Sequence, residues 1–542
     1  MDFVTATSIS WPKVSAASLS GPSAWSSLSL SIGLSIYRLT VHPYAKYPGP
    51  LLAKLTSWYS IYHTYIGDLH TDIWKCHEKY GDIVRYGPNR LLINTEPALK
   101  AIYGHGANVQ KSNAYLRFSP VPDVYPTLAT LDNARHSQLR RILNQGLSET
   151  QIRSMDAELR RIAFLFAERL GEAEDRFKSR STSPGPTENH NSDGWSAAKD
   201  MAEWCDFFTF DTMSQVVFGT SYHLLSSADN HWIVDCVLGQ LRRISFLNQL
   251  RQLENMKLDK VLFPDARRKA FRFTGMSRQI METRKDRMGN DAKNDLFAKL
   301  LAAKDRETGK ALSHRQLWTE SNTLIIAGSD TSSTGMAATF FYLSRNPSAY
   351  DEVANEVRSV FPTPDSVCQG SKLSSCVYLR ACIQEALRLA PAVSGALWRE
   401  VLPGLKIRIE GDTETLDIPA AYEVGTGIWT INHNERYYPQ PFSFRPERWI
   451  PEESGEETVH LAKAAFATFS IGPRNCVGKG LAMIEMTLAM AAVISRFDFR
   501  RADGAAGEVG EGKGSFDGQF QTFWAFTSFK DGPMIQFRPR RY

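Results

Sequence analysis

The segment Phe469–Gly478 constrains what this 542-residue chain can fold into more than any other stretch. It places one cysteine, Cys476, in a turn bounded by Gly472 and Gly478, and an apolar run from Leu481 to Phe497 predicts a helix directly after it. Backbone N–H groups and the helix dipole at such an N-terminus favour a thiolate. The glycines let a flat group approach the backbone closely. We therefore expect Cys476 to face a cofactor from the start of a buried helix.

A cysteinate in such a turn can be the axial ligand of a haem iron, and thiolate ligation favours cleavage of an O–O bond. A lone cysteine is more often a small buried core residue, and a nucleophilic cysteine would need a histidine base. The pattern Phe-x-x-Gly-x-Arg-x-Cys-x-Gly resembles the haem-binding signature of the cytochrome P-450 monooxygenases. The resemblance implies a metal bond from Cys476 to haem b (iron protoporphyrin IX), with Phe469 and Arg474 among the cofactor-binding residues.

Composition agrees with a single globular enzyme. Hydrophobic residues make up 43% of the chain and charged residues 22%, as in ordinary soluble domains. The net charge of +5 is mild and speaks against nucleic acid as a partner. Seven scattered cysteines without a C-x-x-C pair argue against a disulfide scaffold. No dinucleotide-binding or P-loop motif is found, so we expect no nicotinamide or nucleotide site of its own in this chain. The family resemblance then implies that electrons from NADPH come through a separate reductase.

Helical periodicity dominates the chain, and strand-like runs are few. Helices are predicted at 149–170, 195–218, 231–253, 266–288, 313–343, 350–360 and 373–389. Strands are predicted at 83–86, 90–94 and 405–409. The fold class is therefore mainly α with small β-sheets, and the family resemblance places the haem between a long distal helix and the helix after the cysteine loop. We expect one catalytic domain over 41–542.

The N-terminal segment 14–37 carries no charge and is long enough to span a bilayer, although it is rich in serine and contains Pro22. Arg38 and Lys46 follow it, which predicts a cytosolic body. We interpret residues 1–40 as a leader and weak membrane anchor, which places the protein at the endoplasmic reticulum. A disordered or cleaved leader is the alternative.

Within the predicted helix 313–343, small and polar residues interrupt an apolar run at Leu324–Gly335. Such residues are poor helix formers, so their clustering indicates a functional site beside a local opening of the helix. Ala-Gly-Ser-Asp-Thr resembles the oxygen-activation motif of the same family. It implies that Gly328 leaves room for dioxygen and that Thr331 and Asp330 supply protons. Close packing of a serine-rich helix is the alternative.

Two further motifs concern ion pairs. Glu385 and Arg388 stand at i, i+3 spacing on one helix, which by itself predicts only a surface salt bridge. The downstream turn Arg-Pro-Glu-Arg-Trp resembles a family turn whose arginine, here Arg448, joins that pair in a buried cluster. We assign the cluster to the integrity of the fold and of the haem pocket.

Haem propionates need cationic partners. The family resemblance implies that His136 and Arg140, in an H-x-x-x-R pattern, and Arg399 serve them together with Arg474. For His136 the plain alternative is a surface histidine on a basic helix.

The family lines its substrate pocket with stretches that correspond here to 104–128, 323–331, 392–396 and 523–526. Their apolar and aromatic residues predict a small apolar substrate. These are Tyr115, Phe118, Tyr125, Ile326, Val393, Phe523, Trp524 and Phe526. We expect a monomeric, fungal-type monooxygenase that hydroxylates or oxidatively cyclises a secondary metabolite such as a terpenoid, polyketide or indole alkaloid. A haem-thiolate isomerase or dehydratase that uses no external electrons, and a non-catalytic haem sensor, remain alternatives.

Overall fold

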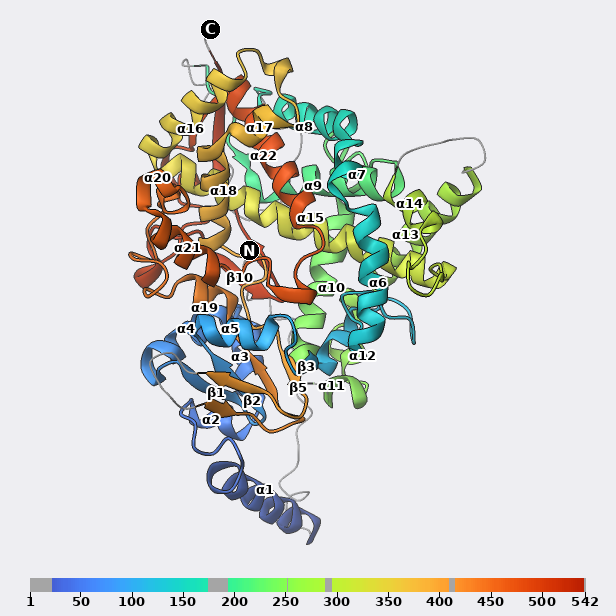
Figure 1. Cartoon of the computed structure of the whole chain (residues 1–542), viewed down its shortest axis with the longest axis vertical. Helices are drawn as coiled ribbons and strands as arrows, with labels where there is room; N and C mark the ends of the chain where they lie inside the picture. Colours follow the sequence, from blue (N-terminus) through green and yellow to red (C-terminus); the bar gives the residue numbers. More distant parts are fainter. Residues whose placement is uncertain (1–21, 174–193, 251, 288–294, 409–414, 541–542) are drawn as a thin grey trace.

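The computed structural model describes residues 22–173, 194–250, 252–287, 295–408 and 415–540. Helices form most of the molecule, and the sheet that contains β1, β2, β3 and β5 lies toward the end from which the N-terminal helix leaves (Figure 1). The expectation of a mainly α fold with small β-sheets is therefore confirmed. The predicted strands are found as β1, β2 and β6, and residue 409 lies outside the described residues.

The longest helices surround the centre of the molecule. They are α6 (Asn133–Gly146), α8 (Asp156–Leu170), α9 (Met201–Phe218), α10 (Trp232–Gln249), α13 (Pro264–Arg287), α15 (His314–Arg345), α16 (Pro347–Val360), α18 (Val377–Leu389) and α22 (Lys479–Arg496). The others are α1 (Pro22–Thr40), α2 (Leu51–Leu55), α3 (Trp58–Ile66), α4 (Leu69–Tyr80), α5 (Glu96–Tyr103), α7 (Glu149–Arg153), α11 (Gln252–Asn255), α12 (Asp259–Leu262), α14 (Leu296–Ala302), α17 (Ser371–Ser375), α19 (Ile428–Asn432), α20 (Pro451–Ser454), α21 (Glu456–Ala465) and α23 (Gly504–Gly507).

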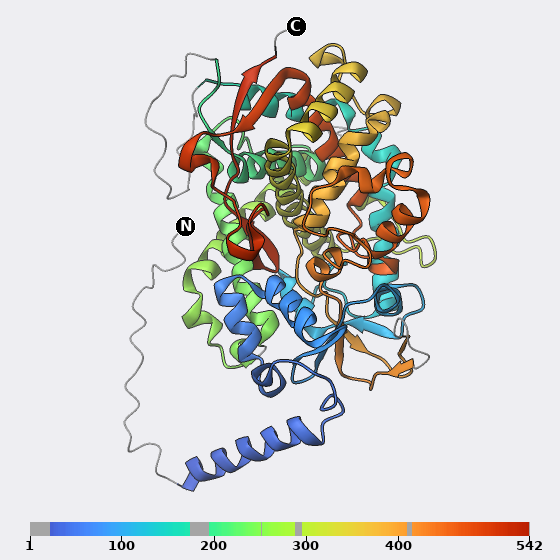
Figure 2. The same ribbon diagram turned by 90° about the vertical axis from the view of Figure 1, so that its left-hand side faces the viewer.

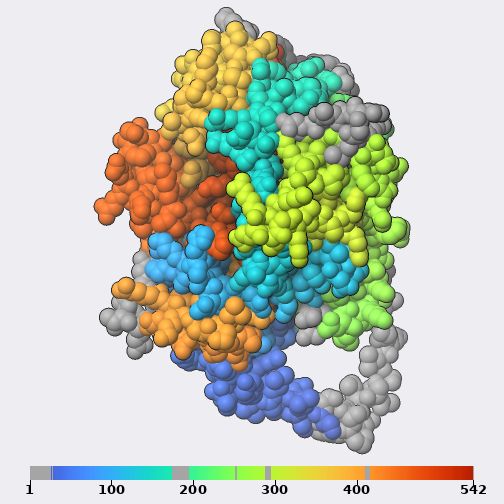
Figure 3. All heavy atoms as spheres, turned by 45° about the vertical axis from the view of Figure 1, so that its right-hand side comes forward, coloured from blue at the N-terminus to red at the C-terminus, as the bar shows by residue number. Residues whose placement is uncertain are grey.

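In the described ranges the strands form four small sheets. The largest has the order β1 (Ile83–Gly87), β2 (Arg90–Ile93), β8 (Glu423–Gly425), β5 (Arg399–Val401), β3 (Val109–Lys111), in which only β2 and β8 run parallel. The others are β4 (Lys199–Asp200) with β12 (Met534–Pro539) and β9 (Phe497–Arg501), β10 (Thr522–Ala525) with β11 (Thr527–Lys530), and β6 (Lys406–Arg408) with β7 (Thr415–Asp417). In Figure 3 blue and orange parts of the chain, which are far apart in the sequence, lie side by side on one face of the molecule.

Some predicted helix boundaries were wrong for local reasons. The stretch 149–170 divides into α7 and α8 at Ser154 and Met155. Helix α9 begins at Met201 instead of 195, because Lys199 and Asp200 pair with β12, and the Asp200 carboxylate then accepts the N–H of Ala202 as an N-cap. Long-range strand pairing decides this boundary.

Helix α15 crosses the middle of the molecule and packs along α9, with α18 and α22 on its other sides (Figure 1). Its first turn is capped by Ser313, whose hydroxyl accepts the N–H of Gln316. Almost all of α9 is buried. The largest apolar core surrounds these helices. Close packing in that core holds α15 rigidly, so the side chains on its exposed face are held in fixed positions.

Helix α1 projects from the body of the molecule (Figure 2). Across the described ranges, which begin at residue 22, no helix combines the length and the apolar character needed to cross a bilayer. Residues 1–21 of the predicted leader and anchor, 1–40, lie outside the described residues.

Candidate active site

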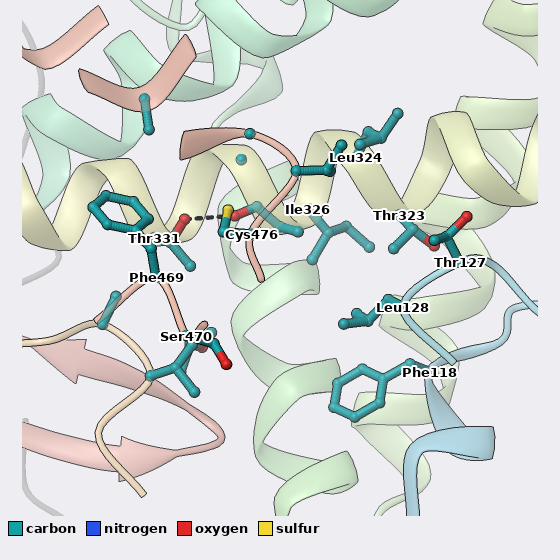
Figure 4. A pocket seen from close by; sticks show the side chains of 18 of the residues that line it. Phe118, Thr127, Leu128, Thr323, Leu324, Ile326, Thr331, Phe469, Ser470 and Cys476 are labelled. Carbon is teal, nitrogen blue, oxygen red and sulfur yellow. Dashed lines mark hydrogen bonds between the residues drawn. The ribbon is translucent and has the colours of Figure 1, made fainter. Parts of the chain in front are cut away.

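One cavity collects most of the predicted site residues. It lies between α15 and the loop that precedes α22, and Figure 4 shows Thr331 and Phe469 projecting into it near Cys476. Its wall includes Gly328, Thr331, His136, Arg140, Arg399, Phe469, Arg474 and Cys476. Asp330 and the three residues of the predicted ion cluster do not line it.

The cysteine loop is closed by its own backbone. The N–H of Cys476 donates to the carbonyl of Phe469 at 2.8 Å. Gly472 has a φ of +68°, and a Cβ there would lie 2.1 Å from the carbonyl oxygen of Tyr103 at the end of α5. We expected this glycine to admit a flat cofactor, but the structure shows that it admits the backbone of α5. Gly478 has no such neighbour, since only Cys476 Sγ comes within 4.0 Å.

The Cys476 side chain opens into the cavity three residues before α22 begins. Burial raises the pKa of the thiol, whereas the N–H groups of Gly478 and Lys479 and the Arg140 guanidinium oppose that shift. The two N–H groups lie at the start of α22 and provide the stabilisation of negative charge that the sequence predicts, and Arg140 of α6 adds a positive charge.

A group of cations forms one side of the cavity. Arg474 donates to the carbonyls of Thr130 and Leu131, and Arg140 donates to the carbonyl and side chain of Asn475. Arg399 donates to the carbonyls at 397 and 398. Among the described residues, none of these arginines forms an ion pair with a carboxylate. Neutral oxygens therefore hold the arginines in place, and the positive charges of the arginines can interact with an anionic ligand.

Lys111 is a member of this group that the sequence analysis missed. It pairs directly with Arg399 across β3 and β5, and it donates to the carbonyl of Leu128 at 2.5 Å. Burial, together with Arg399, Arg474 and Arg140, holds its pKa well below the usual value. No local motif marks this lysine, because only the pairing of two distant strands brings it into the cavity.

His136 is buried in the same wall, which excludes the alternative of a surface histidine. Burial lowers its pKa to about 3, and the neighbouring cations act in the same direction. The ring is therefore neutral at physiological pH and can serve an anion only as a hydrogen-bond donor.

The distal side of the cavity is formed by α15, which remains helical throughout 314–345. The predicted local opening was wrong: the Thr331 hydroxyl donates to the carbonyl of Ala327 at 2.6 Å, so the polar side chain is satisfied within the helix. Gly328 lines the cavity, and a Cβ there would lie 2.6 Å from Cε of Met213. That glycine therefore also lets α9 pack close to α15.

Asp330 points to the other side of α15, where a buried charged group surrounds it. Lys530 of β11 forms an ion pair with Asp206 of α9 at 3.0 Å, and both side chains are almost fully buried. Burial raises the pKa of Asp330 to about 6, whereas Lys530 lowers it. One Asp330 oxygen, Oδ2, has no hydrogen-bond partner among the described residues, and the Thr527 hydroxyl lies nearby on the cavity wall.

The Glu385 cluster lies away from the cavity and is completely buried. Glu385 accepts from Arg388 at 2.8 and 2.9 Å and from Arg448 at 3.0 Å. Burial alone would raise the pKa of Glu385, but the two arginines hold it below the usual value. The Trp449 indole also donates to Glu385, at 2.9 Å. The sequence indicated the three charged residues but not this fourth partner.

A sequence profile described as cytochrome P450 matches residues 49–508. The chain belongs to the cytochrome P450 family, the haem-dependent monooxygenases. It is 58% identical to cytochrome P450 monooxygenase apf7 of Gibberella fujikuroi, with 94% of this chain and 96% of the relative covered. It is also 40% identical to cytochrome P450 monooxygenase AKT7 of Alternaria alternata, with 93% of this chain and 94% of the relative covered. The family predicted from the cysteine signature is thus confirmed.

The residues of this P450 fit haem. The cavity brings one thiol, which can bind a metal, together with a set of cations on one side. Buried cations without counter-charges cost free energy, so this side suits the two carboxylates of a haem. Lys111, His136, Arg140, Arg399 and Arg474 would face the propionates, and Cys476 the iron.

The substrate end of the P450 cavity was predicted in part. Tyr115, Phe118, Ile326, Val393 and Phe526 line it as expected. Three predicted aromatic residues, Tyr125, Phe523 and Trp524, do not. Phe523 lies against Gly67, and Trp524 lies against Gly395. The wall formed by α10, with Val237, Gln240, Leu241 and Ile244, was not predicted, because its apolar periodicity looks like that of any core helix.

Proposed function

We propose that this P450 activates dioxygen and oxidises an apolar secondary metabolite of the terpenoid, polyketide or indole-alkaloid type. Hydroxylation would insert one oxygen atom into the substrate, whereas oxidative cyclisation would join two of its atoms without inserting oxygen. Electrons come from NADPH through a separate reductase. The observation that carries the proposal is that Cys476 and Thr331 open into the same cavity, whose remaining wall is mostly apolar. The names of the relatives support an oxygenase but leave the substrate open.

The proposed haem site assigns a role to each residue. Cys476 would hold the haem iron, with Phe469 beside it in the cavity wall, and the group of cations would hold the propionates. When bound, haem supplies a redox-active iron that activates dioxygen. The thiolate is stabilised by the N–H groups at the start of α22, and the apolar walls exclude water from the reacting atoms.

The proposed proton route begins at Asp330. Its buried Oδ2 can hold a proton, since burial keeps the pKa of this carboxyl near 6. The Thr527 hydroxyl, between Asp330 and the cavity, can pass that proton onward, and the Thr331 hydroxyl can present one to the reacting oxygen. The Lys530–Asp206 ion pair places one positive and one negative charge beside Asp330, and these act on its pKa in opposite directions. We assign the Glu385–Arg388–Arg448 cluster to pocket integrity only.

The test of this function is the carbon monoxide spectrum of the reduced protein. The wild type is expected to show the red-shifted Soret band of thiolate-ligated haem. Cys476→Ala should lose that band, whereas Cys368→Ala, a cysteine outside the cavity wall, should keep it. Retention of the band by Cys476→Ala contradicts the assignment of the ligand.

The two alternatives predict different electron requirements. A monooxygenase consumes dioxygen and NADPH in the presence of a reductase. Turnover without NADPH would favour an isomerase or dehydratase, and no oxygen consumption with any reductase tried would favour a haem sensor. Metabolite profiling of a deletion strain would then identify the substrate.

We also propose that this P450 is monomeric and is held at the endoplasmic reticulum membrane by residues 1–40, with the domain 41–542 in the cytosol. Exposed apolar side chains along α1, namely Leu30, Ile32, Ile36 and Leu39, support membrane contact. Replacing Leu30 and Ile36 by glutamate should move the full-length protein to the soluble fraction. Unchanged membrane sedimentation would contradict the role of α1.

A further inference from the structure

The loop 119–132, which leads into α6, forms part of the cavity wall at the end remote from the cysteine. Thr127 and Leu128 line the cavity there. Figure 4 shows both at one end of the cavity and Thr331 at the other. Leu128 is half-buried, and its side chain projects into the open space. The shape of this end of the cavity therefore depends on where the loop is held.

One face of α15 holds the loop through two buried polar side chains. The Glu320 carboxyl accepts hydrogen bonds from the backbone N–H and the hydroxyl of Thr127, at 2.7 and 2.8 Å. One turn earlier, Gln316 donates to the carbonyl of Tyr125 at 2.8 Å and to the same Glu320 oxygen at 3.1 Å. Residues four apart share a helix face, so Glu320 and Gln316 act as a single clamp. Glu320 is 1% exposed and Gln316 6%, so water does not compete for these bonds.

The same loop carries carbonyls that hold two cations of the haem side. Lys111 donates to the carbonyl of Leu128, and Arg474 donates to the carbonyls of Thr130 and Leu131. The backbone N–H and the hydroxyl of Thr130 both donate to the carbonyl four positions earlier, at 2.9 Å, which closes this part of the loop into a turn. A contact that fixes one residue of the turn therefore also fixes the carbonyls of the others.

A carboxyl buried at this point costs free energy. Burial raises the pKa of Glu320 to about 7, although the hydrogen bonds from Thr127 and Gln316 act in the opposite direction. Apolar side chains could join the helix and the loop without that cost. Hydrogen bonds are directional, whereas apolar contacts are not. The clamp therefore fixes the position of the loop instead of only covering it.

We propose that Glu320 is a positioning residue that determines how long a substrate the cavity holds. By fixing Thr127 it keeps Leu128 at the remote end, so a substrate that is oxidised beside Thr331 is also held at its far end. The eleven positions from Glu320 to Thr331 correspond to about 16.5 Å along α15. This inference rests on the proposed function and narrows its substrate class to elongated apolar molecules that reach Leu128.

The test uses two probes that bind haem iron through the same imidazole ring. 1-Methylimidazole fills only the iron side, whereas 1-dodecylimidazole adds an apolar chain toward Leu128. The Kd of each is measured from the shift of the Soret band of the haem-loaded, full-length protein. Burial of one methylene corresponds to roughly a fourfold gain in affinity. The wild type should therefore prefer the long probe, and loss of contact with two terminal methylenes should reduce that preference roughly fifteenfold.

Variants separate the clamp from general stability. Glu320→Met removes the acceptor with little change in volume and should reduce the preference for the long probe by at least about tenfold. Glu320→Gln keeps an oxygen that can accept from Thr127 and should retain the preference. Thr319→Val is the matched control, because it removes a buried hydroxyl of the same helix that donates within α15 to the carbonyl of Arg315. The control should also retain the preference.

A milder pair of variants at the other side of the clamp repeats the test in case Glu320→Met does not load haem. Thr127→Val removes only the hydroxyl and should reduce the preference roughly threefold, the effect of one neutral hydrogen bond. Thr127→Ser keeps the hydroxyl and should retain it. Equal preferences in Thr127→Val and Thr127→Ser contradict the proposal.

Hydrogen–deuterium exchange reports on the loop directly. The amides of 119–132 should exchange faster in Glu320→Met than in the wild type, and at the wild-type rate in Glu320→Gln and Thr319→Val. Unchanged exchange in Glu320→Met overturns the proposal, as does a wild type that binds the two probes equally.

The carbon monoxide spectrum of the wild type is recorded first on the same preparation. Loss of the thiolate band would count against the proposed function as a whole. A normal band, with the preference for the long probe intact in Glu320→Met, would overturn only the role of Glu320.

Discussion

The Trp449 indole gives the sharpest test of how the buried Glu385 cluster is stabilised. Trp449→Phe keeps an aromatic ring in a site that is 5% exposed, and it removes the N–H that donates to Glu385 at 2.9 Å. Arg388, Arg448 and the backbone N–H of Arg445 still donate to the carboxylate. The perturbation therefore removes one of several hydrogen bonds and leaves the ion pairs intact.

The expected loss follows from the charge of the acceptor. A hydrogen bond to a charged group contributes about 1.5–3 kcal/mol to stability, and the smaller phenyl ring adds a packing loss. Arg388→Ala is more severe: leaving a buried charge without its partner costs about 3–5 kcal/mol, and we expect little haem-loaded protein from it.

Trp318→Phe is the matched control. Trp318 is similarly buried, at 8% exposed, but its indole N–H has no partner among the described residues. The free energy of unfolding is measured by chemical denaturation, followed by helical ellipticity and by the Soret band. Trp449→Phe should lose at least about 1.5 kcal/mol more than Trp318→Phe. Equal losses in the two variants would refute the reasoning.

Three further predictions concern the site. Because burial raises the pKa of Asp330 to about 6, the folded protein keeps a proton there that the unfolded chain releases, and stability falls as pH rises from about 4 to 6. Lys530→Met should extend that fall above pH 6 in chemical denaturation, and an unchanged pH profile would count against the buried charge group. Gly472→Ala should lower haem content far more than Gly514→Ala, since both glycines have a positive φ but only the first abuts a carbonyl; similar effects would contradict the packing role. Thr331→Ala should release more peroxide per NADPH consumed, with unchanged coupling as the contrary result.

Local patterns predicted the parts of this P450 that depend on residues near one another in the chain. The cysteine loop and the helix after it follow from ten consecutive positions and an apolar period. Glu385 and Arg388 share a face because of their i, i+3 spacing. The interruption of α15 by small and polar residues also marked the distal wall, although the Thr331 hydroxyl satisfies itself within the helix instead of opening it.

The features that the sequence analysis missed all join distant segments. Lys111 enters the cation group through the pairing of β3 with β5, and Lys530 meets Asp206 across 324 positions of the chain. Gln240 reaches the cavity only because α10 packs over it. The sequence by itself determined the family and the approximate positions of the long helices, and it predicts Cys476 as the ligand to iron, because these features depend on residues that are close together in the chain. Tertiary structure alone decided which charges from distant segments, such as Lys111 and Arg399 or Lys530 and Asp206, come together, because that depends on which strands pair and which apolar faces are buried together.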